Sequence, residues 1–503
     1  MICSDAAGIL TMTTTAAFLS GPHHHIINGQ AVPAASGETF LVQNPATEVD
    51  IASVARGSAV DIDAAVHAAR HAFENGWKDM PAPKRTDILN RFAAKIAKNA
   101  DLLADVETSE SGTPRSWSYP TMLQGFPSFL SYYAGWPTKI LGDTIPAHPL
   151  GRDDQDFLVY TQREPIGVVG AITPWNSPAG IFLMKLAPAL AAGCTVVVKS
   201  PELAPLTTEL MVRLAHEAGL PDGVLNLVHG YGADAGAALA AHPGVDKISF
   251  TGSTATGRLI LDAAKGNLKK VSLELGGKSP FVVMKDADLD EAAPAAAIAC
   301  FGMSGQNCMA ATRIFVHEDI MASFLEKLDQ TIDFLKVGNG FDQGVFVGPL
   351  ISAAQKEKVL GYIEAGKADG ATLHRGGKAL DGPGHWVEPT VFTNCRHDMR
   401  IAREEIFGPV MTILPFGDDE AALDTALNDT NYGLSGSVWS KDIGKAIRLS
   451  RKIDSGQVAI NAHAAISAET PFGGNRQSGW GRELGKEGLD EYLKTKAISV
   501  RLA

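Results

Sequence analysis

The amino-terminal part of the chain carries apolar residues at the spacing of amphipathic helices. Alanine and phenylalanine recur every three to four positions from 64 to 73, and Asp61 is placed to cap the first turn. Large apolar residues repeat the pattern in the next segment, at Ile88, Phe92, Ile96 and Leu103. The spacing therefore predicts helical structure in both segments.

Short β-branched runs then alternate with helical stretches. Strands are predicted at 167–172, 195–199, 224–228, 247–250 and 270–273. Helices are predicted between them, including 206–218 and 233–241. Strands separated by helical crossovers indicate βαβ units and a parallel sheet covered on both faces.

A second series of the same kind follows. Its predicted strands are 281–284, 312–316, 410–415 and 436–439, and its predicted helices are 320–335, 353–367 and 445–453. Two successive α/β domains are the simplest architecture that explains both series.

Two further segments fit neither series. Residues 140–161 are extended and contain Pro146, Pro149 and Gly151, and residues 496–502 alternate like a strand without a partner nearby in sequence. Open strand edges tend to pair with other strands. We therefore expect the two segments to pair with each other, across subunits.

The chain has 503 residues, of which 45% are hydrophobic and 20% charged, as in a soluble globular protein of about two to four domains. Its net charge of −12 supplies no positive field for phosphates, which argues against a nucleic-acid or anionic-membrane partner. No apolar run approaches the ~18 residues of a membrane span. We expect no membrane association.

Five cysteines are scattered along the chain without a CxxC pair: Cys3, Cys194, Cys300, Cys308 and Cys395. Neither a disulfide framework nor a zinc site is expected from such a set, and a reducing cytoplasm suits it best.

Residues 1–25 are rich in alanine and threonine and contain no lysine or arginine. A secretory signal needs a basic start and a transit peptide needs arginines, so we expect a disordered extension, with Met12 as an alternative start. The histidines at 23–25 leave a short metal-binding tract as the less favoured alternative.

Residues 250–257, FTGSTATG, follow a predicted strand and precede a helical stretch. Two glycines bracket small hydroxylated residues, so backbone N–H groups and a helix N-terminus can face a pyrophosphate. The spacing departs from GxGxxG, and an ordinary strand-to-helix turn remains the alternative.

Lys199 and Glu202 lie at the end of the predicted strand 195–199, where open α/β sheets bind ligands. Such a charged pair can hold the ribose hydroxyls of a dinucleotide, and the carboxylate of Glu202 would repel a 2′-phosphate. A solvated loop with a helix cap is the alternative.

Cys308 lies in a glycine- and amide-rich loop, residues 303–309, ahead of a predicted helix. A free thiol is only a few per cent ionised at neutral pH, so a nucleophilic role needs the helix N-terminus and nearby amide donors. Glu274 ends a buried strand beside two glycines, and a carboxylate in an apolar site titrates upward into the range of a general base. A small buried hydrophobe and a core ion pair are the alternatives.

Several segments occur in the order and spacing of one family. They are TPWNSP at 173–178, FTGSTATG at 250–257, LELGGK at 273–278, GQNCM at 305–309, EEIFGP at 404–409, PFGG at 471–474 and SGWGRELG at 478–485. From about Ile27 to the C-terminus the chain resembles the aldehyde dehydrogenase superfamily, in its NAD-dependent, hydrolytic, non-CoA-acylating form. The resemblance implies an α/β fold with two parallel-sheet domains and a small β excursion for oligomerisation.

The implied division has an extension at 1–25, a Rossmann-like NAD-binding domain at 26–139 and 162–275, and a catalytic domain at 276–477. Residues 140–161 and 478–503 would form the oligomerisation segment of a homodimer or homotetramer.

The resemblance also implies the roles of three catalytic residues. Cys308 would attack the aldehyde carbonyl, and the side-chain amide of Asn176 would donate to the oxyanion beside the backbone N–H of Cys308. One such donor is worth about 3 kcal/mol of the barrier. Glu274 would activate the water that hydrolyses the thioester, with Glu483 as the fallback base. Because acylating members commonly lack this carboxylate, Glu274 favours release of a free acid.

By the same resemblance the cofactor is NAD, with NADP less favoured, and no metal takes part. The implied cofactor contacts are Lys199 and Glu202 on the adenosine ribose, Gly252 and Ser253 on the phosphates, Glu405 and Phe407 at the nicotinamide ribose, and Trp175 and Gly232 as further contacts.

The positions matching the family's substrate tunnel are apolar: Ile181, Met184, Ile466 and Phe472. With no arginine for a carboxylate and no aromatic cage for a quaternary ammonium, they favour an aromatic or medium-chain aliphatic aldehyde. A catabolic semialdehyde dehydrogenase and a catalytically silent structural homologue are the alternatives. A cysteine hydrolase would need a histidine, and none lies in these segments.

Overall fold

The computed structural model describes residues 14–147, 150–152 and 155–502. Its larger sheet has eight strands in the order β2-β1-β9-β8-β7-β10-β11-β23. The five central strands are parallel: β7 (Val168–Ile172), β8 (Thr195–Lys199), β9 (Leu225–Val228), β10 (Lys247–Thr251) and β11 (Lys270–Glu274). All five were predicted, because both faces of these strands are buried and their sequences are near-continuous β-branched runs.

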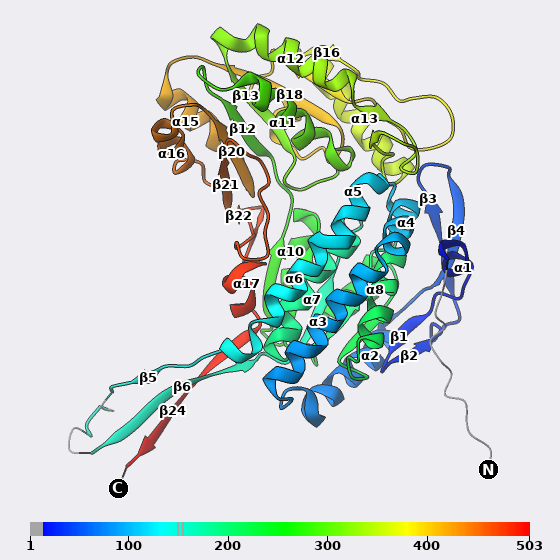
Figure 1. Ribbon diagram of the computed structural model, residues 1–503, viewed down its shortest axis with the longest axis vertical. Coiled ribbons are helices and arrows are strands. Elements are labelled where there is room, and N and C mark those ends of the chain that lie inside the picture. The colour runs from blue at the N-terminus through cyan, green and yellow to red at the C-terminus, as the bar shows by residue number, and fades with distance from the viewer. Residues whose placement is uncertain (1–13, 148–149, 153–154, 503) are drawn as a thin grey trace.

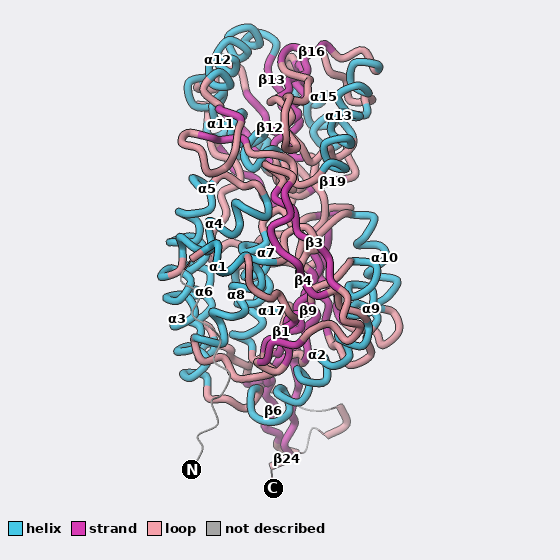
Figure 2. The backbone as a smooth tube through the Cα atoms, turned by 90° about the vertical axis from the view of Figure 1, so that its right-hand side faces the viewer, coloured by secondary structure: helices cyan, strands magenta, loops and turns pink. Residues whose placement is uncertain are grey.

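Helices cover both faces of this sheet. Figure 2 shows α3, α6 and α8 on one side of the strands and α2, α9 and α10 on the other. The helices of this part are α2 (Ala59–Ala72), α3 (Ala82–Lys98), α4 (Ala100–Ser111), α5 (Arg115–Pro120), α6 (Phe126–Ala134), α7 (Pro178–Ala192), α8 (Leu206–Glu217), α9 (Ala237–Ala241) and α10 (Thr254–Ala264). Helix α2 begins at a capping box in which Ser58 is the N-cap, so Asp61 completes the cap from the third helical position.

The second sheet has seven strands in the order β16-β17-β18-β13-β12-β20-β21. They are β12 (Ser279–Val283), β13 (Ala311–His317), β16 (Thr372–Arg375), β17 (Thr390–Thr393), β18 (Val410–Phe416), β20 (Ser435–Trp439) and β21 (Gln457–Ile460). All are parallel except the edge strand β16. The main helices here are α11 (Leu289–Phe301), α12 (Met321–Asp333), α13 (Ala353–Ala368), α15 (Glu420–Asn428) and α16 (Ile443–Ser450). The predicted α/β fold, with two mainly parallel sheets formed one after the other along the chain, is therefore confirmed (Figure 1).

A three-stranded arm projects from the body and carries the C-terminus at its tip (Figure 1). It consists of β5 (Thr144–Ile145), β6 (Phe157–Pro165) and β24 (Leu493–Arg501), with β24 antiparallel to β6 over nine residue pairs. The two extended segments thus pair as predicted, but within one chain rather than across subunits. Strand β6 pairs with β5 on one side, and its other edge is free to pair with β24 of the same chain.

The C-terminal boundary of the arm also differs from the prediction of 478–503. Strand β23 (Gly479–Trp480) extends the larger sheet by pairing with β11, and α17 (Gly485–Asp490) follows it in the body. The arm starts at Leu493, because the hydrogen bonds from 479–480 go to Leu273 and Glu274 instead of to β6.

The prediction of a disordered extension at 1–25 is wrong for its described part. Residues 15–19 form helix α1 (Thr15–Leu19), and β1 (His25–Ile27) pairs β9 and β2 (Gln30–Val32) at the sheet edge. The reason is Phe18, which is fully buried, packs edge-on against His23 at 5.2 Å and lies under the guanidinium of Arg213. Residues 1–13, with Cys3 and Met12, lie outside the described residues.

The remaining elements are small. A hairpin joins β3 (Thr39–Asn44) to β4 (Val49–Ala55), and two-stranded pairs join β14 (Lys336–Val337) to β15 (Val345–Val347) and β19 (Tyr432–Gly433) to β22 (Asn475–Arg476). None of the helices in the described ranges has the length and apolar character needed to cross a membrane.

Candidate active site

The two sheets meet end to end at the predicted motifs. Asn176, Gly252 and Glu274 follow or close strands β7, β10 and β11 at the carboxyl edge of the larger sheet. Cys308 precedes β13 and Glu405 precedes β18, at the amino edge of the second sheet. A cavity of about 210 Å³ opens between these edges. Its lining includes Trp175, Asn176, Thr251, Gly252, Ser253, Leu275, Gly276, Cys308, Gln355, Lys358, Glu405 and Phe407.

The loop before Cys308 is tightly wound. Met303, Ser304 and Gly305 all have φ between +53° and +69°, and a Cβ at Gly305 would lie 2.2 Å from the carbonyl oxygen of Gly408. Glycine is required at this close approach. The side-chain Oε1 of Gln306 accepts a hydrogen bond of 3.0 Å from the backbone of Ile351, which anchors the loop.

Cys308 is followed by strand β13, so the prediction of a helix after it is wrong. The run 311–317 pairs on both sides, with β12 and β18, and is buried throughout. No helix N-terminus therefore stabilises the thiolate. Enclosure of the thiol, together with the nearby carboxylates of Glu405 and Glu274, raises the pKa of Cys308 to about 12.

Asn176 faces the nucleophile's loop from the start of α7. Its buried side-chain Nδ2 donates a hydrogen bond of 3.0 Å to the carbonyl of Gln306. A carboxamide carries two N–H donors, so one remains for a charged oxygen near Cys308. The position agrees with the predicted role as an oxyanion donor.

Glu274 is buried, with 3% of its surface exposed, and neither carboxyl oxygen has a hydrogen-bond partner among the described residues. Burial raises the pKa of Glu274 well above its ordinary value, and the neighbouring Glu483 adds to the effect. A Cβ at Gly473 would lie only 2.7 Å from its Oε1. The glycine of the PFGG segment therefore leaves the room that this carboxyl needs.

Glu483 is not a free base in this structure. It forms a buried ion pair with Lys185 of α7, and Ser249 lies within hydrogen-bond distance of both, at 3.2 Å from Lys185 Nζ and 3.3 Å from Glu483 Oε1. Sequence reasoning missed Lys185. The signal was present, because Lys185 is the one charged residue in the otherwise apolar segment 178–192.

The phosphate turn and the nicotinamide side of the cavity are both preformed. Ser253 caps α10 by accepting a hydrogen bond of 3.1 Å from Thr256, which leaves the first amides of the helix facing the cavity. Glu405 Oε1 accepts a hydrogen bond of 2.9 Å from Gly277, and a Cβ at Gly276 would lie 2.4 Å from its other oxygen.

The aromatic and ribose contacts complete this side. The rings of Trp175 and Phe407 meet edge to face at 5.3 Å. Lys199 forms an ion pair of 2.9 Å with Glu202 at the end of β8, and Gly232 opens the helical turn that leads to Gly236 beside Lys199. These three do not line the 210 Å³ cavity. Backbone amides, small residues and a carboxylate at the end of β8 are groups that suit a dinucleotide, and their individual contacts with it stay predictions.

The predicted tunnel residues belong to the core of the part built on the larger sheet. Ile181, Met184 and Phe472 are buried there, and Ile466 and Cys308 are partly buried and pack against the same extensive core. None of the four predicted residues lines the 210 Å³ cavity at Cys308.

His463 was also missed by sequence reasoning. Its Nε2 lies 2.8 Å from the carbonyl oxygen of Met309, and its Nδ1 lies 3.0 Å from the hydroxyl of Ser437. Burial lowers the pKa of His463, so the neutral ring donates from Nε2 and accepts at Nδ1. No local pattern singles it out, since its partners come from the loop that carries Cys308 and from the distant strand β20.

No metal site emerges from the geometry. Across the described ranges, no group of three or more His, Cys, Asp or Glu side chains is arranged to hold a metal ion. Of the three histidines at 23–25, His23 is hydrogen-bonded at 2.8 Å to Glu209 instead.

Comparison with known proteins agrees with this site. The profile of the Aldehyde dehydrogenase family matches residues 32–498. The chain is 46% identical over 484 residues to aldehyde dehydrogenase 1 of Tanacetum cinerariifolium, covering 94% of each chain. It is 46% identical over 479 residues to the mitochondrial benzaldehyde dehydrogenase of Antirrhinum majus, covering 95% of this chain and 88% of the relative.

Among solved structures, the NAD⁺ complex of an aldehyde dehydrogenase from Bacillus cereus superposes with a TM-score of 0.94. The two chains are 42% identical, and the match covers 97% of this chain and 98% of the other.

Proposed function

Because the chain belongs to the aldehyde dehydrogenase family, we propose that it oxidises an aromatic or medium-chain aliphatic aldehyde to the free acid, with NAD as oxidant. Aldehyde oxidation with a nicotinamide dinucleotide follows from the family and its NAD⁺-bound relative. The substrate class, the preference for NAD and the residue roles are the proposal. One observation carries it: Cys308 and Asn176 line one cavity, and the carboxyl of Glu274, which has no hydrogen-bond partner among the described residues, precedes the lining residue Leu275 and acts electrostatically on Cys308.

In the first step the sulfur of Cys308 bonds to the aldehyde carbon. Its surroundings raise the pKa of the thiol to about 12, so the thiol is protonated at neutral pH and its proton passes to the carboxylate of Glu274 as the sulfur attacks. The carbonyl oxygen then becomes an oxyanion, which the free N–H of Asn176 and the backbone N–H of Cys308 stabilise. Preorganised donors of this kind cost no reorganisation during the reaction.

A bound dinucleotide supplies the two-electron acceptor for the second step. Glu405, Phe407 and Trp175 would hold its nicotinamide side, and the turn Gly252–Ser253 its phosphates. Glu202 would take the adenosine ribose, where its carboxylate disfavours the 2′-phosphate of NADP. An ion pair of 2.9 Å with Lys199 holds this carboxylate at the carboxyl end of β8.

Hydrolysis of the thioester needs a base for water. Glu274 is suited to it, because its raised pKa makes the ionised carboxylate a stronger base than an exposed glutamate. It removes a proton from water, the oxygen attacks the acyl carbon, and the sulfur of Cys308 leaves as thiolate. Lys185 and Glu483 form a buried ion pair that acts electrostatically on Glu274, and the carboxylate of Glu483 is the group to which the proton would then pass.

The apolar character of the predicted tunnel residues Ile181, Met184, Ile466 and Phe472 supports a neutral, apolar aldehyde. The named activity of the benzaldehyde dehydrogenase relative is consistent with an aromatic substrate. We further propose a homodimer or homotetramer assembled through the arm, and a reducing compartment such as the cytoplasm, since the described cysteines are all free.

A substrate panel tests the proposal. We expect NADH formation from benzaldehyde and hexanal, with kcat/KM at least tenfold above that for succinic semialdehyde or betaine aldehyde. The opposite ranking would replace it with a semialdehyde or betaine aldehyde function. Absence of NADH with every aldehyde would show a catalytically silent homologue.

A further inference from the structure

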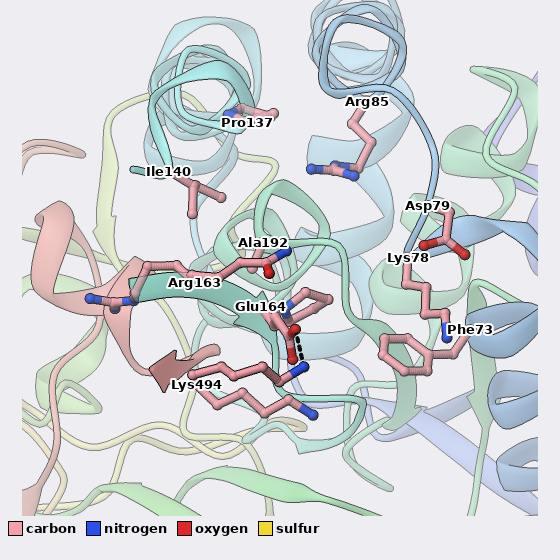
Figure 3. A pocket seen from close by; sticks show the side chains of 13 residues that line it. Phe73, Lys78, Asp79, Arg85, Pro137, Ile140, Arg163, Glu164, Ala192 and Lys494 are labelled. Carbon is pink, nitrogen blue, oxygen red and sulfur yellow. Dashed lines mark hydrogen bonds and ion pairs between the residues drawn. The ribbon is translucent and has the colours of Figure 1, made fainter. Parts of the chain in front are cut away.

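A second hollow lies far from the catalytic groups, at the root of the arm. Its volume is about 420 Å³, twice that of the cavity at Cys308. One wall is formed by β6 and β24, and the other by the start of α3 and the residues before it. Figure 3 shows the side chains of both walls converging on the space between them.

Cationic groups dominate this hollow. Five basic side chains line it, against two acidic ones: Lys78, Arg85, Arg163, Lys494 and Lys496 against Asp79 and Glu164. This excess occurs in a chain whose net charge is −12. A local positive field in an acidic protein is therefore concentrated here.

The ion pairs of the hollow leave part of this charge uncompensated. Lys496 pairs with Glu164, and Arg163 pairs with Asp490 at 2.7 Å. Lys494 forms no ion pair with any residue in the described ranges, nor does Lys78, whose Nζ lies 5.9 Å from the ring centre of Phe73. Two lysines are thus available to an external anion.

Arg85 adds a buried donor. It is only 8% exposed, and its guanidinium points from α3 toward the hollow (Figure 3). Nη1 donates a hydrogen bond of 2.7 Å to the carbonyl of Met80, but Nε is buried and has no partner among the described residues. A buried N–H without an acceptor is costly, and an oxyanion would supply that acceptor.

We propose that this hollow is a binding site for a small phosphate-type anion, held by Arg85, Lys78 and Lys494. A tetrahedral oxyanion presents acceptors in several directions, which suits donors that come from both walls. The volume exceeds that of one phosphate, and Phe73, Pro137 and Ile140 provide an apolar wall beside the cations. The site therefore has room for the organic part of a small phosphate monoester.

Calorimetry with the full-length protein tests the proposal. NAD⁺ is present at saturation throughout, so that the phosphate turn at Ser253 does not compete. Inorganic phosphate and phenyl phosphate are titrated at constant ionic strength. We expect saturable binding of phosphate, weakened at least tenfold in the variant K78Q/K494Q. If phenyl phosphate bound with a lower Kd than inorganic phosphate, the ligand would be a phosphate monoester. If the two bound equally, it would be the free anion.

The matched control is K265Q/K441Q, which removes two positive charges from exposed lysines remote from the hollow. It should bind phosphate like the wild type. Absence of saturable binding in the wild type, or equal weakening in both double variants, would overturn the proposal. Sedimentation gives a further check on the oligomeric state. If K78Q/K494Q had fewer subunits per particle than the wild type, and the wild type bound no phosphate, the two lysines would contact another subunit and the proposal would be overturned.

Discussion

The side-chain amide of Asn176 and the backbone carbonyl of Gln306 are joined by a hydrogen bond of 3.0 Å. This contact links the larger sheet to the loop that carries Cys308, two residues further along the chain. It orients the amide so that one donor is used for structure and the other is free. A single hydrogen bond therefore fixes the position of the oxyanion donor Asn176 relative to the loop that carries Cys308.

Replacing Asn176 should affect the chemical step more than substrate binding. We expect N176A to lower kcat about 100-fold or more, the usual effect of losing one oxyanion donor of about 3 kcal/mol, with little change in KM. Steady-state kinetics measure both. The matched variant N176D keeps the size but removes the donor, and it should be as impaired. A less than fivefold loss in either variant would contradict the role.

Glu274 should control deacylation. We expect E274Q to form one equivalent of NADH per subunit in a burst and then turn over at least 100-fold more slowly, because the thioester forms but water is not activated. In the wild type the rate should rise with pH toward the raised pKa of Glu274, and this rise should vanish in E274Q. Rapid-quench measurement of the burst distinguishes this from a loss of acylation, in which no burst would occur.

The thiol of Cys308 should become more reactive when a neighbouring carboxylate is neutralised. Glu405 raises the pKa of Cys308, so E405Q should lower it and accelerate alkylation by iodoacetamide at pH 7 in the cofactor-free protein. The rate should be followed against pH in both proteins, with C308S as the unreactive control. A slower or unchanged rate in E405Q would show that the carboxylate does not face the sulfur.

His463 should act as a positioning residue through the carbonyl of Met309. H463F keeps a ring but removes the 2.8 Å hydrogen bond, and we expect about a tenfold loss of kcat with KM changed less than twofold. H463Q can still donate and should recover most of the activity. If both variants lose the same activity, or if KM rises instead, the hydrogen bond does not position the nucleophile's loop.

Glu107 should make folding stability depend on pH. Burial raises the pKa of Glu107 to about 7 in the folded chain, against 4.5 for an ordinary glutamate, while Ser118 donates a hydrogen bond to the carboxyl. The folded state therefore holds the proton more tightly, and the contribution to stability present below about 4.5 is lost as the pH rises through 7. We expect E107Q to flatten this decline and to unfold at a higher temperature than the wild type at pH 8. Thermal unfolding at pH 5, 6.5 and 8 measures it, and an unchanged decline would contradict the assignment.

The strands could be predicted where burial on both faces leaves a continuous β-branched run. Thr195–Lys199 forms β8 over the predicted range for this reason. Two expectations met after Cys308: the β-branched run at 312–316 predicted a strand, while the loop 303–309 was expected to lead into a helix. The strand forms, as β13, because it pairs with β12 and with Val410–Phe416 about a hundred residues later.

The candidate site shows the same division. Residues that lie in dense motifs, such as Asn176 and Glu405, could be selected from the sequence. The Lys185–Glu483 pair joins residues 298 positions apart, and His463 depends on contacts with the nucleophile's loop and with strand β20. Burial and proximity create these roles, and both arise only when the chain has folded.

The chain passes between its two sheets at two places, residues 275–278 and residues 461–478. The first contains Gly276 and Gly277 beneath Glu405 and Cys308, and the second contains His463, Phe472 and Gly473 beside Met309 and Glu274. Any rotation of one sheet against the other must therefore pivot on the reacting groups themselves. The reaction centre lies at the axis of such a motion and is therefore the part of the molecule that the motion displaces least.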